Sequence, residues 1–415
     1  MANCKPSNKT ILFIGDYNRT DYVSLLKSCK DIIRFTFLNF SSVAEETNSY
    51  YKEYGNAVYW KDFKDAYELL KKIKPFKVVF LYIESYHHVA LNVACKKLVI
   101  PTYLLEHGMR ADYNIAFDPE MVCIPKVSFY QKLRTFINKI NQFSARFKSK
   151  LFLNRTIRHS TPEDAAFLRT FISTRRKYNF LVTFKKIKDP KRLADYYISF
   201  SSKVFEIHRT HESLTSDQKV HFIGVPYFDK LAGMVEAQKK RNIIFIDQPL
   251  AENQLLGWTK ESKEQFAKEF IRMCQQANYN LFIKPHPLQD LSMWQEQAKK
   301  NKITLITDGQ LKASLPFTPV IIGFYSTYLM PLAAMRHTTL LTLENHPAGP
   351  FNVSKPFVEA GVSHPVYLLE ELPQLLSEID IIHQKQINNK NTFANDWLYI
   401  FDGKSGDRLK AILLS

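Results

Sequence analysis

The chain has 415 residues, of which 45% are hydrophobic and 23% charged, and its 57 Lys and Arg against 40 Asp and Glu give a formal charge of +17. At roughly 150 residues per domain, this length favours two globular domains. The near-average composition excludes a mainly disordered chain, and 12 Gly with 19 Pro exclude a collagen-like one.

The five cysteines predict neither a disulfide framework nor a zinc site, because they lie far apart and form no CxxC pair. The first nine residues are polar and resemble no secretion signal. No apolar run approaches the roughly 18 residues that a membrane-spanning helix needs. We therefore expect a protein of the cytosol, without a metal or another cofactor.

The first half of the chain alternates short apolar runs with helical patterns. Strands are expected at Thr10–Ile14, Arg34–Phe40, Lys77–Ile83 and Leu98–Leu105, with a helix over Asp62–Lys72, and further strands near Phe180–Phe184, Val204–His208 and Val220–Ile223. Nearly continuous apolar strands between helices predict a parallel sheet covered on both faces.

The strand that ends in LLEHGMR presents Glu106 and His107 at its carboxyl end, before the flexible Gly108. A carboxylate in that position is a candidate general base or nucleophile, and its histidine neighbour a candidate for adjusting the pKa of that carboxylate. A structural pair that only caps a helix is the alternative. Weaker candidates follow or end other strands of this half: Asp16, Glu84 and Asp112.

A basic stretch interrupts this half at about residues 126–159, where no acidic residue occurs between Glu120 and Glu163. Its aromatic and aliphatic residues are spaced by three and four, which predicts an amphipathic helix with a cationic face. Adsorption to an anionic membrane is the functional interpretation. Nucleic-acid binding and a solvated face on a packed helix remain as alternatives.

A charged connector, residues 236–241, separates this half from a second series of strands. These are expected at Asn242–Ile246, Asn280–Lys284, Ile303–Ile306, Val320–Gly323 and Thr339–Leu343, with helices over Lys260–Ala277, Leu291–Lys300 and Thr327–Arg336. The pattern predicts an α/β fold with doubly wound domains over residues 1–235 and 241–415. Such domains bind ligands at the carboxyl ends of their strands. No GxGxxG or GxxxxGK[ST] sequence follows a predicted strand, so the usual dinucleotide and P-loop signatures are missing.

Three segments of the second half carry candidate chemistry. In NLFIKPHPL, a strand ends in Lys284 and His286, and the two flanking prolines fix the backbone so that both side chains can contact a phosphate. In VIIGFYSTYL, Ser326 and Thr327 offer hydroxyls at the start of a helix, where they either bind an anion or only cap the helix. Glu344 ends the next strand as a carboxylate suited to ribose hydroxyls, or as an ordinary surface group.

IDQPL (residues 246–250), KPHP (284–287) and the Gly-x-x-Ser-Thr of GFYST (323–327) together resemble the pattern of bacterial sialyltransferases. EHG (106–108) and GVPYFD (224–229) are more similar to capsule-polysaccharide transferases of the Kdo-transferase type. Both families use CMP-activated sugar acids and have the GT-B fold, two Rossmann-like domains facing a central cleft. The acidic-acidic-Gly motif of the sialyltransferases is present only as Glu106-His107-Gly108, or distantly as Thr307-Asp308-Gly309.

The resemblance implies that Lys284 and His286 contact the CMP phosphate, that Ser326 and Thr327 hold its oxygens or the sugar carboxylate, and that Glu344 takes the ribose. Gln248 of IDQPL is a weaker candidate. We also expect the last helix of the C-terminal domain to pack back on the N-terminal domain.

We therefore expect a glycosyltransferase that moves a 2-keto sugar acid (sialic, pseudaminic or legionaminic acid, or Kdo) from CMP to a capsule or lipopolysaccharide glycan. Its other partners would be a glycan or lipid-linked acceptor and the anionic inner face of the plasma membrane. A CDP-glycerol or UDP-hexose transferase of the same fold is the first alternative. A non-catalytic nucleic-acid-binding protein, suggested by the +17 charge, is the second.

Overall fold

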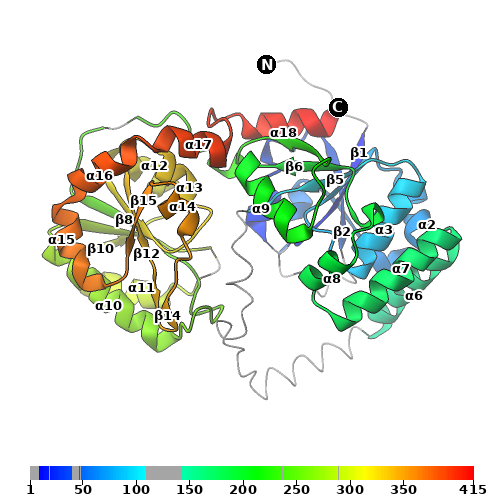
Figure 1. Ribbon diagram of the computed structural model, residues 1–415, viewed down its shortest axis with the longest axis horizontal. Coiled ribbons are helices and arrows are strands. Elements are labelled where there is room, and N and C mark those ends of the chain that lie inside the picture. The colour runs from blue at the N-terminus through cyan, green and yellow to red at the C-terminus, as the bar shows by residue number, and fades with distance from the viewer. Residues whose placement is uncertain are drawn as a thin grey trace. The chain divides into compact units, whose positions relative to one another are not determined.

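A computed structural model describes residues 9–17, 19–39, 46, 48–108, 143–235, 237–287 and 289–415. The chain forms two compact units (Figure 1). Of the described residues, those within 9–107, 143–229 and 403–415 form the N-terminal unit, and residue 108 and those within 230–402 form the C-terminal unit. Several residues considered above lie outside the described residues: the site candidate Asp112, the cysteines Cys4 and Cys123, and residues 126–142 of the basic stretch.

The N-terminal unit is built on a seven-stranded sheet with the order β3-β2-β1-β4-β5-β6-β7. Its strands are β1 (Thr10–Ile14), β2 (Arg34–Asn39), β3 (Gly55–Tyr59), β4 (Lys77–Phe80), β5 (Thr102–Leu105), β6 (Tyr196–Ser199) and β7 (Lys219–Phe222). Every neighbouring pair is parallel. The direction of strand addition reverses between β1 and β4, which is the switch point where open α/β sheets bind ligands.

Two expected strands of this unit are wrong. Phe180–Phe184 lies in helix α8 (Phe180–Lys186), and Val204–His208 lies in helix α9 (Ser202–Glu212). Both segments are rich in aromatic and β-branched residues, but each follows an N-cap whose side chain accepts a backbone hydrogen bond. Those caps are Asn179 and Ser201, and they favour helix where the apolar run alone favours strand.

Helices cover both faces of the sheet. They are α1 (Thr20–Ser24), α2 (Ala66–Ile73), α3 (Tyr86–Lys97), α6 (Phe143–His159), α7 (Pro162–Lys177), α8, α9 and α18 (Ser405–Leu414). Phe152 and Ile157 of α6 and Phe171 of α7 join the same buried core as Val78 and Phe80 of β4. The described part of the basic stretch, residues 143–159, is therefore a helix whose buried side chains join the core of the sheet.

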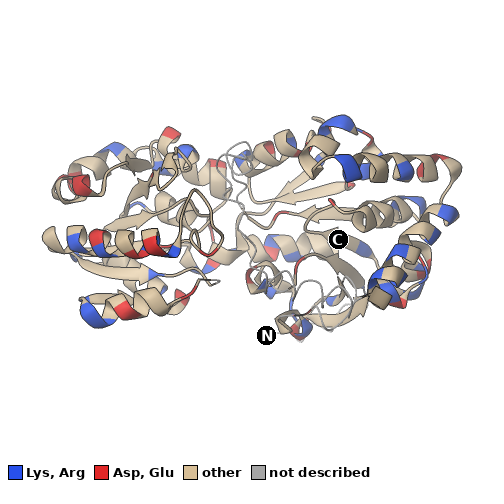
Figure 2. Ribbon diagram, turned by 90° about the horizontal axis from the view of Figure 1, so that it is seen from below, with Lys and Arg blue, Asp and Glu red and all other residues tan. Residues whose placement is uncertain are grey.

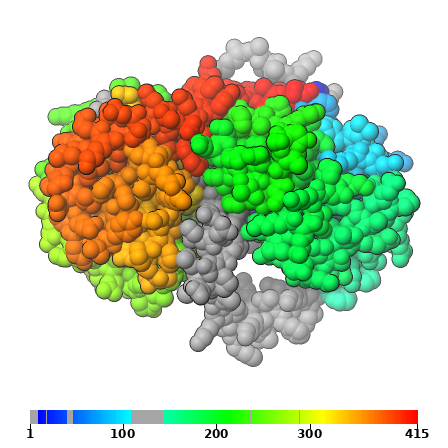
Figure 3. All heavy atoms as spheres, in the orientation of Figure 1, coloured from blue at the N-terminus to red at the C-terminus, as the bar shows by residue number. Residues whose placement is uncertain are grey.

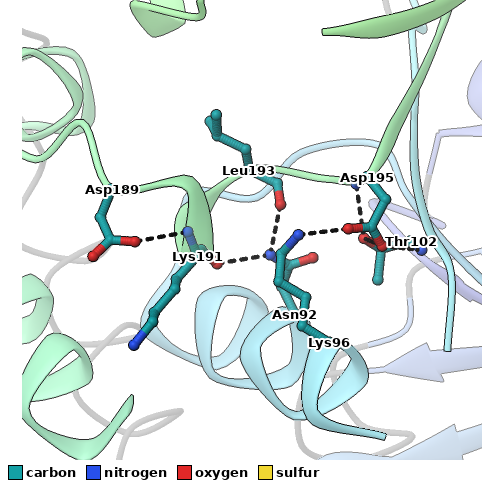
Figure 4. Close-up of polar contacts among 7 residues, drawn as sticks. All are labelled: Asn92, Lys96, Thr102, Asp189, Lys191, Leu193 and Asp195. Carbon is teal, nitrogen blue, oxygen red and sulfur yellow. Dashed lines mark hydrogen bonds and ion pairs between the residues drawn. The ribbon is translucent and has the colours of Figure 1, made fainter. Parts of the chain in front are cut away.

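Polar contacts tie the segment after α8 to α3 and β5 (Figure 4). The side-chain amide of Asn92 donates to the carbonyl of Leu193 at 3.0 Å. Asp195 accepts from the backbone N–H of Thr102 at 2.9 Å and from Lys96 Nζ at 2.6 Å. These bonds fix the return of the chain into β6 after its excursion through α6–α8.

The C-terminal helix α18 belongs to the N-terminal unit. Asp229 accepts from the backbone N–H groups of Ser405 and Gly406 at 3.0 and 2.8 Å, which satisfies the start of the helix. At its other end, Lys77 Nζ donates to the carbonyl of Ile412 at 2.6 Å. The GVPYFD segment thus provides, through Asp229, the anchor for the end of the chain.

The C-terminal unit has a six-stranded sheet with the order β10-β9-β8-β11-β12-β15. Its strands are β8 (Asn242–Ile246), β9 (Asn280–Lys284), β10 (Ile303–Leu305), β11 (Val320–Gly323), β12 (Thr339–Leu343) and β15 (Ser363–Val366). All neighbouring pairs are parallel, and the order reverses between β8 and β11. The five strands predicted for this half are confirmed; β15 was not predicted.

The helices of this unit are α10 (Lys260–Gln276), α11 (Ser292–Lys300), α12 (Asp308–Ser314), α13 (Leu329–Ala334), α14 (Lys355–Glu359), α15 (Leu372–Ser377), α16 (Ile379–Ile387) and α17 (Lys390–Leu398). A short hairpin of β13 (Asn345–His346) and β14 (Gly349–Pro350) follows β12. Phe245 and Ile283 of the sheet pack with Phe270 of α10 and Trp294 of α11 in one buried core. The predicted doubly wound architecture is confirmed for both units.

Within the described residues, no helix combines the length and apolar character needed to cross a membrane. Cys29, Cys95 and Cys274 are buried free thiols. Burial raises the pKa of all three thiols, that of Cys29 to about 12.

Candidate functional site

Most of the predicted phosphate-binding and ribose-binding residues lie at one edge of the C-terminal sheet. Gln248 follows β8, His286 follows β9, Ser326 and Thr327 follow β11, and Glu344 follows β12. Because all four strands are parallel and adjacent in the order β9-β8-β11-β12, their carboxyl ends share this edge. The reversal between β8 and β11 lies at its centre, the position at which such sheets bind nucleotides.

Lys284, the last residue of β9, reaches the Ser-Thr turn. Its ammonium lies 5.6 Å from the centre of the Tyr328 ring, and Tyr328 directly follows Thr327. The same ammonium donates to the carbonyl of Pro285 at 2.8 Å and lies 3.1 Å from Asp308 Oδ1. Lys284 therefore lies beside Tyr328, the residue that directly follows Ser326 and Thr327.

Asp308 forms an ion pair with Lys284. Burial would raise the pKa of Asp308, but the charge and hydrogen bond of Lys284 hold that pKa below its usual range, helped by Lys230 at 3.7 Å. Burial and the neighbouring Asp308 raise the pKa of the Tyr328 hydroxyl. A phosphate that binds Lys284 would therefore share it with an ionised carboxylate.

Gln289 fixes the backbone at His286 with two hydrogen bonds. The side-chain oxygen of Gln289 accepts from the His286 N–H at 3.1 Å, and the Gln289 N–H donates to the His286 carbonyl at 3.0 Å. The histidine side chain itself is half-buried. The two flanking prolines and this pair of hydrogen bonds hold the KPHP loop in one conformation.

Gln289 is held in turn by Asp247, a fully buried carboxylate that sequence reasoning missed. Asp247 accepts from Gln289 Nε2 at 2.5 Å, from Trp294 Nε1 at 2.6 Å and from the Gln248 N–H at 2.8 Å, and it forms an ion pair with buried Lys263. The available signal was Lys263 itself, since a lysine on the buried stripe of α10 requires an anionic partner.

Ser326 caps the turn before α13. Its Oγ accepts from the Tyr328 N–H at 3.2 Å, while the carbonyls of Ser326 and Thr327 accept from the first residues of the helix. The expected helix over Thr327–Arg336 is shorter, Leu329–Ala334. Gly323 permits a close approach here, because a Cβ at this position would lie 3.1 Å from the carbonyl oxygen of Ile246.

Glu344 is fully buried, and its Oε2 accepts from the Ser354 N–H at 3.2 Å. Burial raises the pKa of this carboxyl, against the hydrogen bonds from Ser354 and Thr342. A ribose would reach this carboxylate only after the backbone at Ser354 moved.

A cavity of about 380 Å³ lies beside this edge, and none of the predicted site residues lines it. Its wall includes Trp258 before α10, Phe266 of α10, His346 of the β13–β14 hairpin, and Tyr367 after β15. Trp258 Nε1 donates to His346 Nδ1 at 3.0 Å, and burial lowers the pKa of His346 to about 4. The cavity wall thus combines aromatic rings and the imidazole of His346 with polar side chains that include Ser262, Gln265 and Glu269.

In the N-terminal unit, Glu106 is a buried carboxylate at the start of a chain of charges. His208 Nδ1 lies 3.1 Å from Glu106 Oε2, and His208 Nε2 lies 3.2 Å from Glu212 Oε1. Arg192 then donates to the Glu212 carbonyl at 2.7 Å and lies 3.8 Å from its carboxylate. Sequence reasoning found Glu106 and missed the three other residues, which are separated from it by an excursion of the chain through α6–α8.

His107 is the more accessible member of the EHG segment, with a side chain that is 20% exposed against 1% for Glu106. Its Nδ1 lies 4.0 Å from Glu106 Oε1, and its backbone N–H donates to the same oxygen at 3.1 Å. The rings of His107 and Tyr22 meet edge to face with 4.5 Å between their centres, and Tyr227 donates to the His107 carbonyl at 3.1 Å. The imidazole is thus the part of this pair that a substrate can contact.

Asp16 and Glu84 follow β1 and β4, on the two sides of the switch point of this sheet. Together with burial, their charges raise the pKa of the intervening Tyr82. Within the described residues, no group of three or more His, Cys, Asp or Glu side chains is arranged to hold a metal ion.

Comparison with known proteins shows the family. The family model described as alpha-2,8-polysialyltransferase (POLYST) matches residues 10–344, which is more than half of the chain. No curated protein matches. Among solved structures, the wall teichoic acid polymerase TagF (H444N variant) is similar at TM-score 0.53 and 12% identity, covering 99% of this chain and 89% of that one.

MurG from Acinetobacter baumannii is similar at TM-score 0.51 and 10% identity, covering 98% of this chain and 99% of that one. At these identities the likeness concerns the fold alone, which is that of the GT-B glycosyltransferases. The chain therefore belongs to the alpha-2,8-polysialyltransferase (POLYST) family and is a sialyltransferase-like glycosyltransferase of GT-B type.

Proposed function

We propose that this protein transfers a 2-keto sugar acid of the sialic-acid class from its CMP donor to a surface glycan. One observation carries the proposal: Lys284 and His286 at the end of β9, and Ser326 and Thr327 after β11, lie at the same edge of the C-terminal sheet on the two sides of β8, in a chain of the polysialyltransferase family. The donor carries a carboxylate and a phosphate, and cationic and hydroxyl groups at one sheet edge suit both.

In this reaction the bond between the anomeric carbon and the phosphate oxygen breaks, and CMP leaves with the electron pair. The phosphate of departing CMP gains negative charge, which the ammonium of Lys284 and a protonated His286 stabilise. Ser326 and Thr327 donate hydroxyl hydrogen bonds to the phosphate or to the sugar carboxylate. Glu344 is the proposed ribose ligand, provided that the backbone at Ser354 moves away from it.

We assign the acceptor to the N-terminal unit. The acceptor hydroxyl forms the new bond to the anomeric carbon, and its proton passes to the imidazole of His107. The buried carboxylate of Glu106 lies next to the His107 imidazole and is itself in contact with His208. Glu106 is then a positioning residue, since its carboxylate is covered by protein.

The acceptor glycan is proposed to be lipid-linked, and the protein to work at the anionic inner face of the plasma membrane as a peripheral protein of the cytoplasm. The excess of basic residues in α6–α8 supports this location. No cofactor or metal is proposed, because CMP is already a good leaving group.

A transfer assay tests the proposal. The protein is incubated with CMP-sialic acid, CDP-glycerol or a UDP-hexose and a soluble sialylated oligosaccharide, and products are identified by mass spectrometry. The proposal predicts transfer from CMP-sialic acid. Productive use of CDP-glycerol or a UDP-hexose instead would identify the alternative transferases of the same fold.

The variant His286→Ala should lower turnover by about 100-fold while leaving the thermal unfolding midpoint nearly unchanged, because its side chain is half-buried and contacts the leaving group. His221→Ala, at an exposed histidine of β7, is the matched control. Near-normal turnover of His286→Ala would assign the KPHP loop a structural role.

A further inference from the structure

Helices α6–α8 carry an unusual share of the charge of the protein. Between residues 143 and 188 there are 12 Lys and Arg but only two acidic residues, Glu163 and Asp164, so that 12 − 2 = +10 of the total +17 lies in this segment. Figure 2 shows Lys and Arg recurring along these helices at the edge of the N-terminal unit. The segment is the main source of positive field on this unit.

The charge is concentrated at one end of a helical hairpin. α6 and α7 have 17 and 16 residues and are joined through Ser160 and Thr161, so they run side by side in opposite directions (Figure 1). The start of α6 therefore lies at the same end as the last turn of α7. Both acidic residues lie in the first turn of α7, at the opposite end, where Asp164 pairs with Lys191 at 2.9 Å.

We define the hairpin tip as residues 143–150 of α6 with residues 175–178 at the end of α7. It contains six basic residues and no acidic one. The basic residues are Arg146, Lys148, Lys150, Arg175, Arg176 and Lys177.

Two phenylalanines project from this basic tip. Phe143 is 70% exposed and Phe147 is 52% exposed. They lie one helical turn apart, and their nearly parallel rings are 6.4 Å apart between centres. Tyr178, at the end of α7, is also exposed. Further along α6 the apolar side chains enter the core of the unit, as Phe152 and Ile157 do. At about 100° per residue, Phe143 and Phe147 lie on a different face of α6 from the buried Ser149, Phe152 and Thr156, so the two rings face solvent and not the core.

Figure 3 shows that α7 and α8 form the outer surface of this part of the N-terminal unit. Exposed aromatic rings surrounded by lysines and arginines are the composition of a segment that lies in the headgroup region of an anionic bilayer. A soluble polyanion without exposed bases, such as a nucleic-acid duplex or an acidic glycan, would be bound by the charges and would leave two phenylalanines in water.

We infer that the hairpin tip is a docking surface for an anionic phospholipid bilayer, with Phe143 and Phe147 inserted below the headgroups and the six basic residues above them. This inference rests on the membrane location in the proposed function and names the residues that produce it. It requires no CMP donor, so a protein that binds vesicles but transfers no sugar acid would overturn the proposed reaction and leave the docking surface intact.

Co-sedimentation of the full-length protein with vesicles tests the inference. Phosphatidylcholine vesicles with and without 30% phosphatidylglycerol are used at low and high salt. We expect binding only to the anionic vesicles, and weaker binding at high salt. Phe143→Ser/Phe147→Ser and Arg175→Gln/Arg176→Gln/Lys177→Gln should each lower the partition coefficient by about tenfold or more.

The matched control is Val235→Ser/Ile381→Ser, which removes two exposed apolar side chains from the C-terminal unit. It should bind vesicles like the parent protein. All variants should keep the parent turnover on the soluble acceptor. Unchanged vesicle binding by the phenylalanine variant would overturn the inference, as would an oligonucleotide or soluble acidic glycan that binds the tip more tightly than the vesicles do.

A fluorescence measurement keeps the inference testable if the phenylalanine double variant fails to fold. The native tryptophans, Trp60, Trp258, Trp294 and Trp397, are all at most 7% exposed. Phe147→Trp therefore adds the one exposed indole among the described positions. Brominated acyl chains in anionic vesicles should quench its emission, and an unquenched, red-shifted emission with bound vesicles would contradict insertion.

Discussion

A single buried carboxylate, Asp247, joins three parts of the nucleotide half of the site. It receives four donors, from Lys263 of α10, Trp294 of α11, Gln289 below the KPHP loop and the backbone of Gln248. A buried charge is tolerated only when it is paired and hydrogen-bonded, and here both conditions are met. The position of His286 therefore depends on a residue that touches no substrate.

Replacing Asp247 with Ala should lower the free energy of unfolding by about 3–5 kcal/mol, because Lys263 is left as an uncompensated buried charge. Urea denaturation followed by circular dichroism measures the change. Glu370→Ala, at an exposed carboxylate, should change stability by no more than about 0.5 kcal/mol. Equal stabilities of the two variants would show that Asp247 does not hold the loop.

At the same scale, the sequence revealed the residues that end a strand next to a proline or a glycine, such as Lys284, His286 and Ser326. It could not reveal their supports. Gln289 and Trp294 belong to no recognisable motif, and their role comes only from their hydrogen bonds to Asp247. His208 contacts Glu106 although 102 residues separate them in the chain. The depth of Glu344 was also unpredictable, because the backbone that covers it returns at Ser354.

At the scale of elements, strands buried on both faces were predictable because their apolar runs are continuous, as in β8 and β11. β3 was missed because its residues, GNAVY, are only partly buried and form no such run. The helices α8 and α9 were misread as strands because their aromatic and β-branched residues outweighed the caps Asn179 and Ser201.

A buried lysine in helix α17 predicts how the stability of the protein depends on pH. The first residue of this helix, Lys390, is fully buried and donates to the Ala333 carbonyl of α13 at 2.7 Å, and burial lowers its pKa to about 7. In the unfolded chain its pKa is about 10.4. Between these two pH values the unfolded chain binds more protons than the folded one, so stability rises with pH.

The expected contribution to the slope is up to about 1.4 kcal/mol per pH unit between pH 7 and roughly 10, with no further change from this group below pH 7. Urea denaturation of the parent and Lys390→Met across this range measures it. The methionine variant should lack this part of the rise. Parallel curves for the two proteins would mean that Lys390 is charged in both folded and unfolded states.

At the scale of the whole molecule, the two doubly wound sheets and their switch points followed from the alternation of strands and helices. This alternation does not by itself specify where the last helix packs; the contacts of Asp229 and Lys77 hold α18 in the N-terminal unit. The division of labour proposed here, with the nucleotide on the C-terminal unit and the acceptor on the N-terminal one, places each candidate residue at the carboxyl edge of its own sheet.

The central claim is that Lys284, Ser326 and Thr327 bind the phosphate of a cytidine nucleotide. Isothermal titration calorimetry with CMP and UMP tests it most directly, on the parent, on Lys284→Met and Ser326→Ala/Thr327→Ala, and on Lys300→Met as an exposed control. We predict that CMP binds more tightly than UMP, that both site variants weaken CMP binding by about tenfold or more, and that the control binds like the parent. CMP binding of equal strength in all four proteins, or a preference for UMP, would contradict the account.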